Sequence, residues 1–179
     1  DAHLGRGLTR AALGDVHGAQ ADFARAAELS PNDAEPLLAL GDLQRDLRSY
    51  EDAVATYRAA IAREDADAAS WLKLGNALAL LERYDDAAGA FRNAIERAPE
   101  LAAAFNGLSA SLMHLGRAEQ ARIALDRAAA LDRADPNPLM NLALLHEREG
   151  DDAAARAAWE RALQRDPGSA IARRRLARL

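Results

Sequence analysis

The side chains of this 179-residue chain that could catalyse a reaction or bind a metal are few and widely separated. Its histidines give no HxxxH or HExxH spacing, which a helix needs to bind zinc through two histidines. They are His3, His17, His114 and His146. The chain has no cysteine, so thiolate catalysis, disulfides and cysteine-based zinc sites are excluded.

The remaining polar motifs are typical of helix ends and turns rather than of catalytic or phosphate-binding sites. Two acidic pairs, Asp85–Asp86 and Asp151–Asp152, fall at turns, where a carboxylate stabilises the positive end of the following helix. Gly5 and Gly7 form a GxG, but no strand precedes them, as a phosphate-binding loop requires. Because no nucleophile stands at a catalytic spacing from a base, we expect no enzymatic activity, no metal ion and no cofactor.

The composition indicates which elements carry these residues. Half of the residues are hydrophobic but only 4% are aromatic, and Ala and Leu dominate, which predicts an all-α protein. The net charge of −5 disfavours nucleic acid as a partner. No run of about 18 apolar residues occurs, so we expect no membrane insertion. The start Asp1-Ala2-His3 shows no leader, which we interpret as an excised or processed piece of a longer protein.

A period of 34 residues runs through the chain without an insertion. It gives repeats at about 1–33, 34–67, 68–101, 102–135 and 136–169. Two columns are alanine in every copy, a third is small, and a large residue stands between the two alanines. This alternation is expected where the side chains of one helix fill the gaps of another. The small column is Gly7, Gly41, Gly75, Ser109 and Ala143, and the large column is Phe23, Tyr57, Phe91, Leu125 and Trp159.

Spacings of three and four residues predict two helices in each repeat and about 11 in all. Three glycines, Gly14, Gly116 and Gly150, are placed to end first helices in the left-handed conformation. Prolines stand where second helices must stop. Asp and Asn side chains suit the N-terminal caps. The prolines are Pro31, Pro99 and Pro167, and the capping candidates are Asn32, Asp33, Asp65, Asp67 and Asp135.

These columns resemble the tetratricopeptide repeat, in which a large residue, Leu, a small residue, Ala, an aromatic residue, Ala and Pro recur at this spacing. The resemblance covers almost the whole chain. It implies an all-α, right-handed α-solenoid, a superhelix of antiparallel helix pairs, with residues 1–179 as a single array. The first copy has His3 and Arg6 where large apolar residues belong, so we expect its first helix to be frayed or cut short.

Residues 170–179 match only the beginning of a further repeat and are rich in arginine. Arg173 stands at the large position, which favours a capping helix with a polar outer face. A partial sixth repeat is the alternative.

The resemblance also implies where a partner binds, because the first helices of such repeats line a concave face. In the family, the second, fifth, ninth, twelfth and thirteenth positions commonly point into it. Carried over, they predict a peptide-binding groove that includes Leu38, Asp42, Arg45, Leu72, Asn76, Asn106, Met113, His114, Asn137, Met140 and Arg148.

Two kinds of groove contact are expected. Asn side chains, which both donate and accept, would hold the backbone of an extended peptide, and the apolar positions would accept its side chains. The asparagines are Asn76, Asn106 and Asn137, and the apolar positions are Leu38, Leu72, Met113, Met140 and Leu144. A clamp for a terminal carboxylate, which some family members use, is disfavoured because we find no lysine among the groove positions.

Charge is uneven along the chain, with about −4 over residues 34–67 and +4 over residues 170–179. We therefore predict a partner whose basic part lies over the second repeat, at Asp42 and Asp46. The leading interpretation is a non-catalytic scaffold that binds a peptide or helix of a protein partner. The alternatives are a substrate-recruiting arm of a larger enzyme, of glycosyltransferase, sulfotransferase or oxygenase type, and a self-assembly module that forms homo-oligomers.

Overall fold

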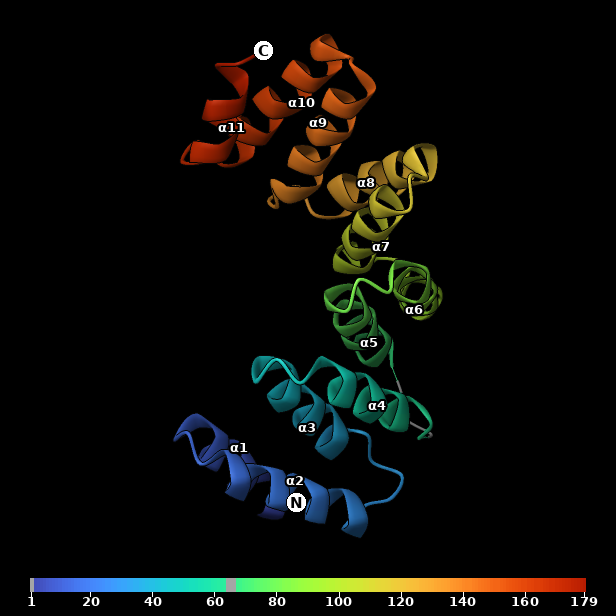
Figure 1. The fold of residues 1–179 in the computed structure, drawn as a ribbon, viewed down its shortest axis with the longest axis vertical. Coiled ribbons are helices and arrows are strands. Elements are labelled where there is room, and N and C mark those ends of the chain that lie inside the picture. Colours follow the sequence, from blue (N-terminus) through green and yellow to red (C-terminus); the bar gives the residue numbers. More distant parts are fainter. Residues whose placement is uncertain (1, 64–66) are drawn as a thin grey trace. The chain divides into compact units, whose positions relative to one another are not determined.

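The computed structural model describes residues 2–63 and 67–179 of the chain. Within these residues the regular elements are eleven α-helices, and the first ten form antiparallel pairs (Figure 1). The chain divides into two compact units, residues 1–97 and 98–179.

The first unit holds three helix pairs. The pairs are α1 (Ala2–Ala12) with α2 (Val16–Leu29), α3 (Glu35–Asp46) with α4 (Tyr50–Ile61), and α5 (Ala68–Leu80) with α6 (Tyr84–Arg97). Each second helix also packs on the next first helix, so α2 contacts α3 and α4 contacts α5. This layering is the packing of helix pairs in a solenoid, and it confirms the predicted helix–turn–helix repeat.

The second unit holds two pairs and a shorter last helix. The pairs are α7 (Ala102–His114) with α8 (Ala118–Leu131) and α9 (Asn137–Glu149) with α10 (Asp152–Arg165). The last helix, α11 (Ala170–Leu176), packs on α10, in the place that the first helix of a following repeat would take. Its Ala172 is buried, whereas Arg173 and Arg174 are exposed. This arrangement is compatible with both a capping helix and a partial repeat.

The small and large columns meet inside each helix pair of the first unit. The large residues at Phe23, Tyr57 and Phe91 are almost fully buried, and each lies against the glycine of its own repeat. A Cβ placed on Gly41 would lie 2.5 Å from a Tyr57 ring carbon. The glycines therefore let the two helices of a pair approach with an aromatic ring between them.

The predicted helix ends are largely confirmed. The turns at Gly14, Gly116 and Gly150 have positive φ, and Arg48 and Glu82 take the same conformation in the other two repeats. Asp67 caps α5 by accepting from the Ser70 amide. Asp33 and Asp135 each lie one residue before the N-cap residue of the following helix. Their side chains accept from the amides of Glu35 and Asn137. The proposed cap at Asp65 lies outside the described residues.

The expectation of a frayed first helix is wrong, because α1 is continuous from Ala2 to Ala12. Its polar residues are directed at Asp22 of α2, whose side chain is only 4% exposed. Arg6 Nε donates to this carboxylate at 2.8 Å, Arg10 does so at 2.8 Å, and His3 lies 3.4 Å away. A buried acid with two guanidinium partners thus replaces the apolar contacts of the other repeats.

Candidate functional site

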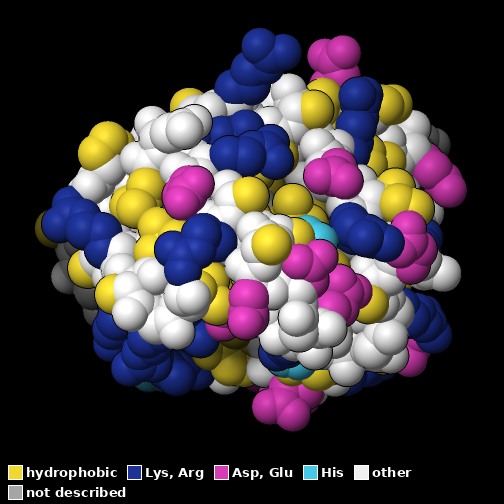
Figure 2. Space-filling model, turned by 90° about the horizontal axis from the view of Figure 1, so that it is seen from above, with side chains coloured by type: hydrophobic (Ala, Val, Ile, Leu, Met, Phe, Trp, Pro, Cys, Tyr) yellow, Lys and Arg dark blue, Asp and Glu magenta, His cyan; other side chains and the backbone are white. Residues whose placement is uncertain are grey.

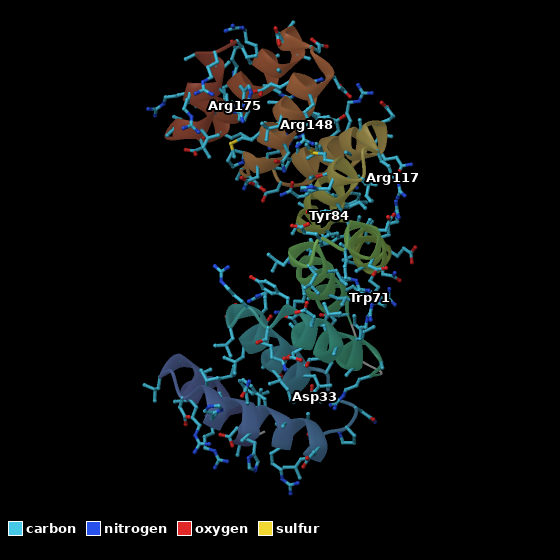
Figure 3. The ribbon with its side chains drawn as sticks, viewed as in Figure 1. Asp33, Trp71, Tyr84, Arg117, Arg148 and Arg175 are labelled. Atoms are coloured by element: carbon cyan, nitrogen blue, oxygen red, sulfur yellow. The ribbon has the colours of Figure 1, made fainter. Side chains whose placement is uncertain are left out.

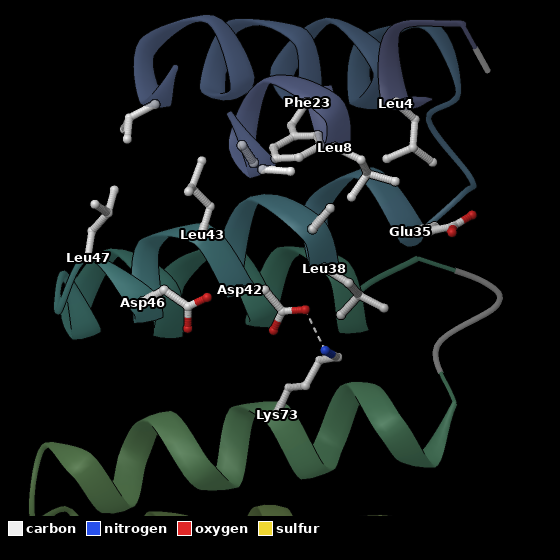
Figure 4. A pocket seen from close by; sticks show the side chains of 14 residues that line it. Leu4, Leu8, Phe23, Glu35, Leu38, Asp42, Leu43, Asp46, Leu47 and Lys73 are labelled. Carbon is white, nitrogen blue, oxygen red and sulfur yellow. Dashed lines mark hydrogen bonds and ion pairs between the residues drawn. The ribbon is translucent and has the colours of Figure 1, made fainter. Parts of the chain in front are cut away.

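The first unit contains a hollow of about 720 Å³ that runs between α1 and α3 and ends beside α5 (Figure 4). We call it the α1–α3 slot. Its first wall is apolar and comes from α1 and α2. This wall consists of Leu4, Leu8, Ala11, Ala12, Val16 and Phe23.

The second wall is α3, which presents two rows of side chains. The row formed by Ala39, Leu43 and Leu47 is apolar, with Leu43 and Leu47 directed toward α1 and α2 (Figure 4). The other row is acidic except for one leucine, and Asp42 and Asp46 lie on the side toward α5 (Figure 4). Its members are Glu35, Leu38, Asp42 and Asp46.

Asp42 is the most heavily bonded residue of the slot. Its carboxylate accepts from the Tyr57 hydroxyl at 2.7 Å and from the Lys73 ammonium at 2.5 Å, and Arg45 lies 3.3 Å away. Burial raises the pKa of Tyr57, and the adjacent Asp42 carboxylate raises it further. Tyr57 therefore stays protonated and donates to Asp42, which fixes the carboxylate at the slot wall.

Several predicted groove residues meet in this slot. Leu38, Asp42 and Asp46 line it, and Arg45 stands beside it with its guanidinium on Asp46 at 2.9 Å. Lys73 also lines the slot, although it stands at none of the groove positions that the resemblance implies. The position list missed Lys73 because the residue sits at the sixth place of its repeat, which the family columns do not include.

The other predicted residues of the first unit, Leu72 and Asn76, do not line the slot. Both lie on α5, where Leu72 is half-buried and Asn76 is exposed. Leu43 and Leu47, which were not predicted, do line the slot. Their signal in the sequence is the spacing of four residues from Ala39, which continues one face of α3.

The predicted residues of the second unit lie on α7 and α9. The Asn106 side chain accepts from Asn141 at 3.1 Å, and Asn137 donates to Asp135 at the start of α9. Met140 packs against two clusters of the core. Met113 is half-buried, and His114 and Arg148 are exposed. The polar groups of Asn106 and Asn137 thus already bond within the chain.

In the second unit, Glu147 on α9 is bonded in the same pattern as Asp42. Glu147 accepts from the Trp159 indole at 2.7 Å and from Arg175 of α11 at 2.9 Å. Figure 3 labels Arg175 on this last helix. In both units an aromatic residue of the second helix donates to a carboxylate of the first helix. A cation at the sixth position of the following repeat, Lys73 or Arg175, completes the arrangement.

The apolar and acidic walls of the slot form a surface on which another molecule can bind. Among the described residues, no three His, Asp or Glu side chains lie close enough to hold a metal ion. None of the helices in the described ranges is long and apolar enough to cross a membrane. On the face shown in Figure 2, acidic and basic side chains are interspersed.

The paired helices, the 34-residue spacing and the glycine–aromatic contacts define an α-solenoid of helix–turn–helix repeats. A family model described as tetratricopeptide repeat matches residues 38–100 and 72–137, and a second with the same description matches residues 136–179. The chain therefore belongs to the tetratricopeptide repeat family. Members of this family are protein-interaction scaffolds, and this chain has their architecture.

Solved structures of the same fold cover nearly the whole chain. The MamA protein has 21% identity and a TM-score of 0.84 over 92% of this chain and 90% of that chain. YrrB, described as a TPR protein with an unusual peptide-binding site, has 16% identity and a TM-score of 0.83 over 99% and 91%. TTC0263, a thermophilic TPR protein of Thermus thermophilus, has 25% identity and a TM-score of 0.72 over 98% and 96%. A comparison with curated protein sequences gave no match.

Proposed function

We propose that this chain is a non-catalytic scaffold that binds a segment of a protein partner in the α1–α3 slot. The observation that carries the proposal is the exposure of apolar side chains at the mouth of the slot. Leu8 is 51% exposed and Leu47 is 45% exposed, and both line the same hollow. Apolar surface gathered in a hollow favours association, because a partner can remove it from water.

The charge of the slot supports a basic partner. Three carboxylates and one ammonium group line it, so its net charge is negative even with Lys73 present. The Asp42 side chain is 31% exposed and is bonded to Lys73 and Tyr57, whereas Asp46, which pairs with Arg45 at 2.9 Å, is 67% exposed. Glu35 and Asp46 are therefore the acids that a basic partner would meet first. The sequence suggested that both Asp42 and Asp46 bind the partner, and we now propose Asp46 rather than Asp42 for this contact. The peptide-binding site in the description of YrrB, which shares the fold, is consistent with such a role.

Site-specific photo-crosslinking tests this proposal. A photoreactive phenylalanine analogue at Leu47 is expected to crosslink a partner segment in a native lysate, and the double variant Leu8→Glu, Asp46→Lys is expected to abolish that adduct. Ile123 on α8 is 64% exposed and lies in the other unit, so the same analogue at Ile123 is the matched control. Equal adducts from both positions, or adducts that survive the double variant, would contradict slot binding.

A further inference from the structure

We infer that the occupant of the α1–α3 slot is an amphipathic helix with an apolar face and a basic edge, rather than an extended peptide. This inference rests on the proposed function and names its ligand class. It follows from the direction of the slot, from the hydrogen-bonding groups in its walls, and from the placement of its charges.

The direction of the slot follows the helix axes. Its lining reaches from Leu4 to Ala12 along α1 and from Glu35 to Leu47 along α3. At a rise of about 1.5 Å per residue, the α3 wall is about 18 Å long. Figure 4 shows the lining side chains spread along this whole length, from Leu47 at one end to Glu35 at the other. A helix of about three turns laid beside α1 and α3 matches that length.

The walls offer few hydrogen-bond donors to an extended peptide, because Lys73 is the one side-chain donor among the described lining residues and it already bonds to Asp42. An extended backbone in an apolar hollow must have its amide and carbonyl groups bonded, and leaving one unbonded costs about 1–3 kcal/mol. Among the described residues, the polar side chains that line the slot are Glu35, Asp42, Asp46 and Lys73, with no Asn, Gln, Ser or Thr. A helix bonds its own backbone, so it can enter such a hollow without these partners.

The charges of the slot lie on one side. The apolar rows of α1 and α3 face each other, whereas Glu35 and Asp46 belong to the acidic row of α3. A bound helix would therefore place apolar residues, spaced by three and four, between the two apolar rows. Its Lys or Arg residues would lie on the helix face next to its apolar face, where they meet the acidic row of α3.

The chain itself holds a helix by this combination of contacts. In α11, Ala172 and Leu176 pack on the core of the second unit together with Leu179. Arg175 of the same helix binds Glu147 of α9 at 2.9 Å. An arginine-rich helix with one apolar edge can thus pack on the last helix pair of these repeats through apolar contacts and one ion pair.

Selection from a display library of random 16-residue peptides, with the full chain as bait, tests the inference. Enriched peptides are expected to carry apolar residues at i, i+3 or i+4, and i+7, with Lys or Arg beside them and no internal proline. A proline introduced at the centre of the tightest peptide is expected to weaken binding at least tenfold, and the peptide's helical circular dichroism should rise on binding. A bait with Glu35→Lys and Asp46→Lys is expected to lose the preference for basic peptides.

The outcomes separate this inference from the proposed function. Peptides that need Leu8 and Leu47 but tolerate proline, or that alternate with a period of two, would overturn the helical occupant and leave slot binding intact. Peptides that bind the Leu8→Glu, Leu47→Glu bait as well as the Ile123→Glu bait would overturn both proposals. A selection that yields no slot-dependent peptide would overturn both as well.

Discussion

At the scale of single residues, the two helices of each pair in the first unit meet at a contact between a glycine and an aromatic ring. A Cβ on Gly75 would lie 2.6 Å from a Phe91 ring carbon, and Phe91 is 1% exposed, so the ring has little room to move. Gly89, on the partner helix α6, has no atom within 4 Å of such a Cβ. Within this helix pair, Gly75 is required for close packing against a ring, whereas Gly89 is not.

The first prediction compares these two glycines. Gly75→Ala should lower the free energy of unfolding by about 1–3 kcal/mol, because the methyl group displaces a buried ring. Gly89→Ala should raise it by about 0.5–1 kcal/mol, because alanine favours the helix and meets no neighbour. Urea titration followed by circular dichroism measures both changes, and a stabilising Gly75→Ala would contradict the role given to the ring contact.

The second prediction concerns the buried carboxylate of Asp22. Hydrogen bonds from Arg6 hold the pKa of Asp22 well below its usual range, against burial, which would raise it. A lowered folded-state pKa stabilises the fold above the unfolded pKa of about 4, and this contribution is lost as the pH falls below it. The loss of stability in Asp22→Asn should therefore be largest at neutral pH and shrink below about pH 4. Unfolding titrations from neutral pH down to about pH 3 check this, and Asp126→Asn, at an exposed acid, is the control.

At the scale of the helices, an arginine near the end of the second helix secures the preceding turn in two repeats. Arg165 donates to the carbonyls of Ala129 at 2.9 Å, Asp132 at 3.1 Å and Asp135 at 2.8 Å. Arg63 bonds to the residues 36, 33 and 30 places before it in the same way. Each guanidinium thus donates to one carbonyl in the last turn of the preceding second helix and to two carbonyls in the turn that follows it.

Removing this arginine should destabilise the second unit. Arg165→Ala is expected to cost about 2 kcal/mol, because hydrogen bonds to a charged donor are lost at the end of α8. Arg161→Ala, four residues earlier on an exposed part of the same helix, should change stability by less than about 0.5 kcal/mol. Hydrogen exchange should show faster opening at the end of α8 in Arg165→Ala alone.

The helices were predictable because packing imposes columns that a single sequence displays. Alanines at fixed spacing recur in five repeats and report the packing between helices, and glycines at turns recur in three repeats and report the local conformation. The left-handed turns at Arg48 and Glu82 could not be read from residue type, because the repeat imposes the conformation on residues that rarely adopt it. The slot was only partly predictable, since the family columns describe one helix at a time. Lys73 enters it from a neighbouring repeat to reach Asp42.

At the scale of the whole chain, acidity is concentrated in one unit. Residues 1–97 carry 17 acidic and 11 basic side chains, whereas residues 98–179 carry 11 and 12. The slot lies in the acidic unit, so association with a basic partner should be faster at low ionic strength. The 34-residue register nevertheless continues from one unit to the next, with the alanine columns at Ala87 and Ala94 followed by Ala121 and Ala128.

We predict that the two units unfold together as the single array that this register indicates, because the stability of repeat proteins depends strongly on the pairing of neighbouring repeats. The chain has two tryptophans, Trp71 in the first unit and Trp159 in the second, and each can be removed by a residue that other repeats carry at the same position. In Trp159→Phe, fluorescence follows the first unit, and in Trp71→Phe it follows the second, while circular dichroism follows the whole chain. In each variant the fluorescence and circular dichroism transitions in urea should coincide, whatever the substitution costs in stability. If fluorescence preceded circular dichroism in one variant and lagged behind it in the other, the units would be folding independently, and a partner bound in the slot would stabilise the first unit alone.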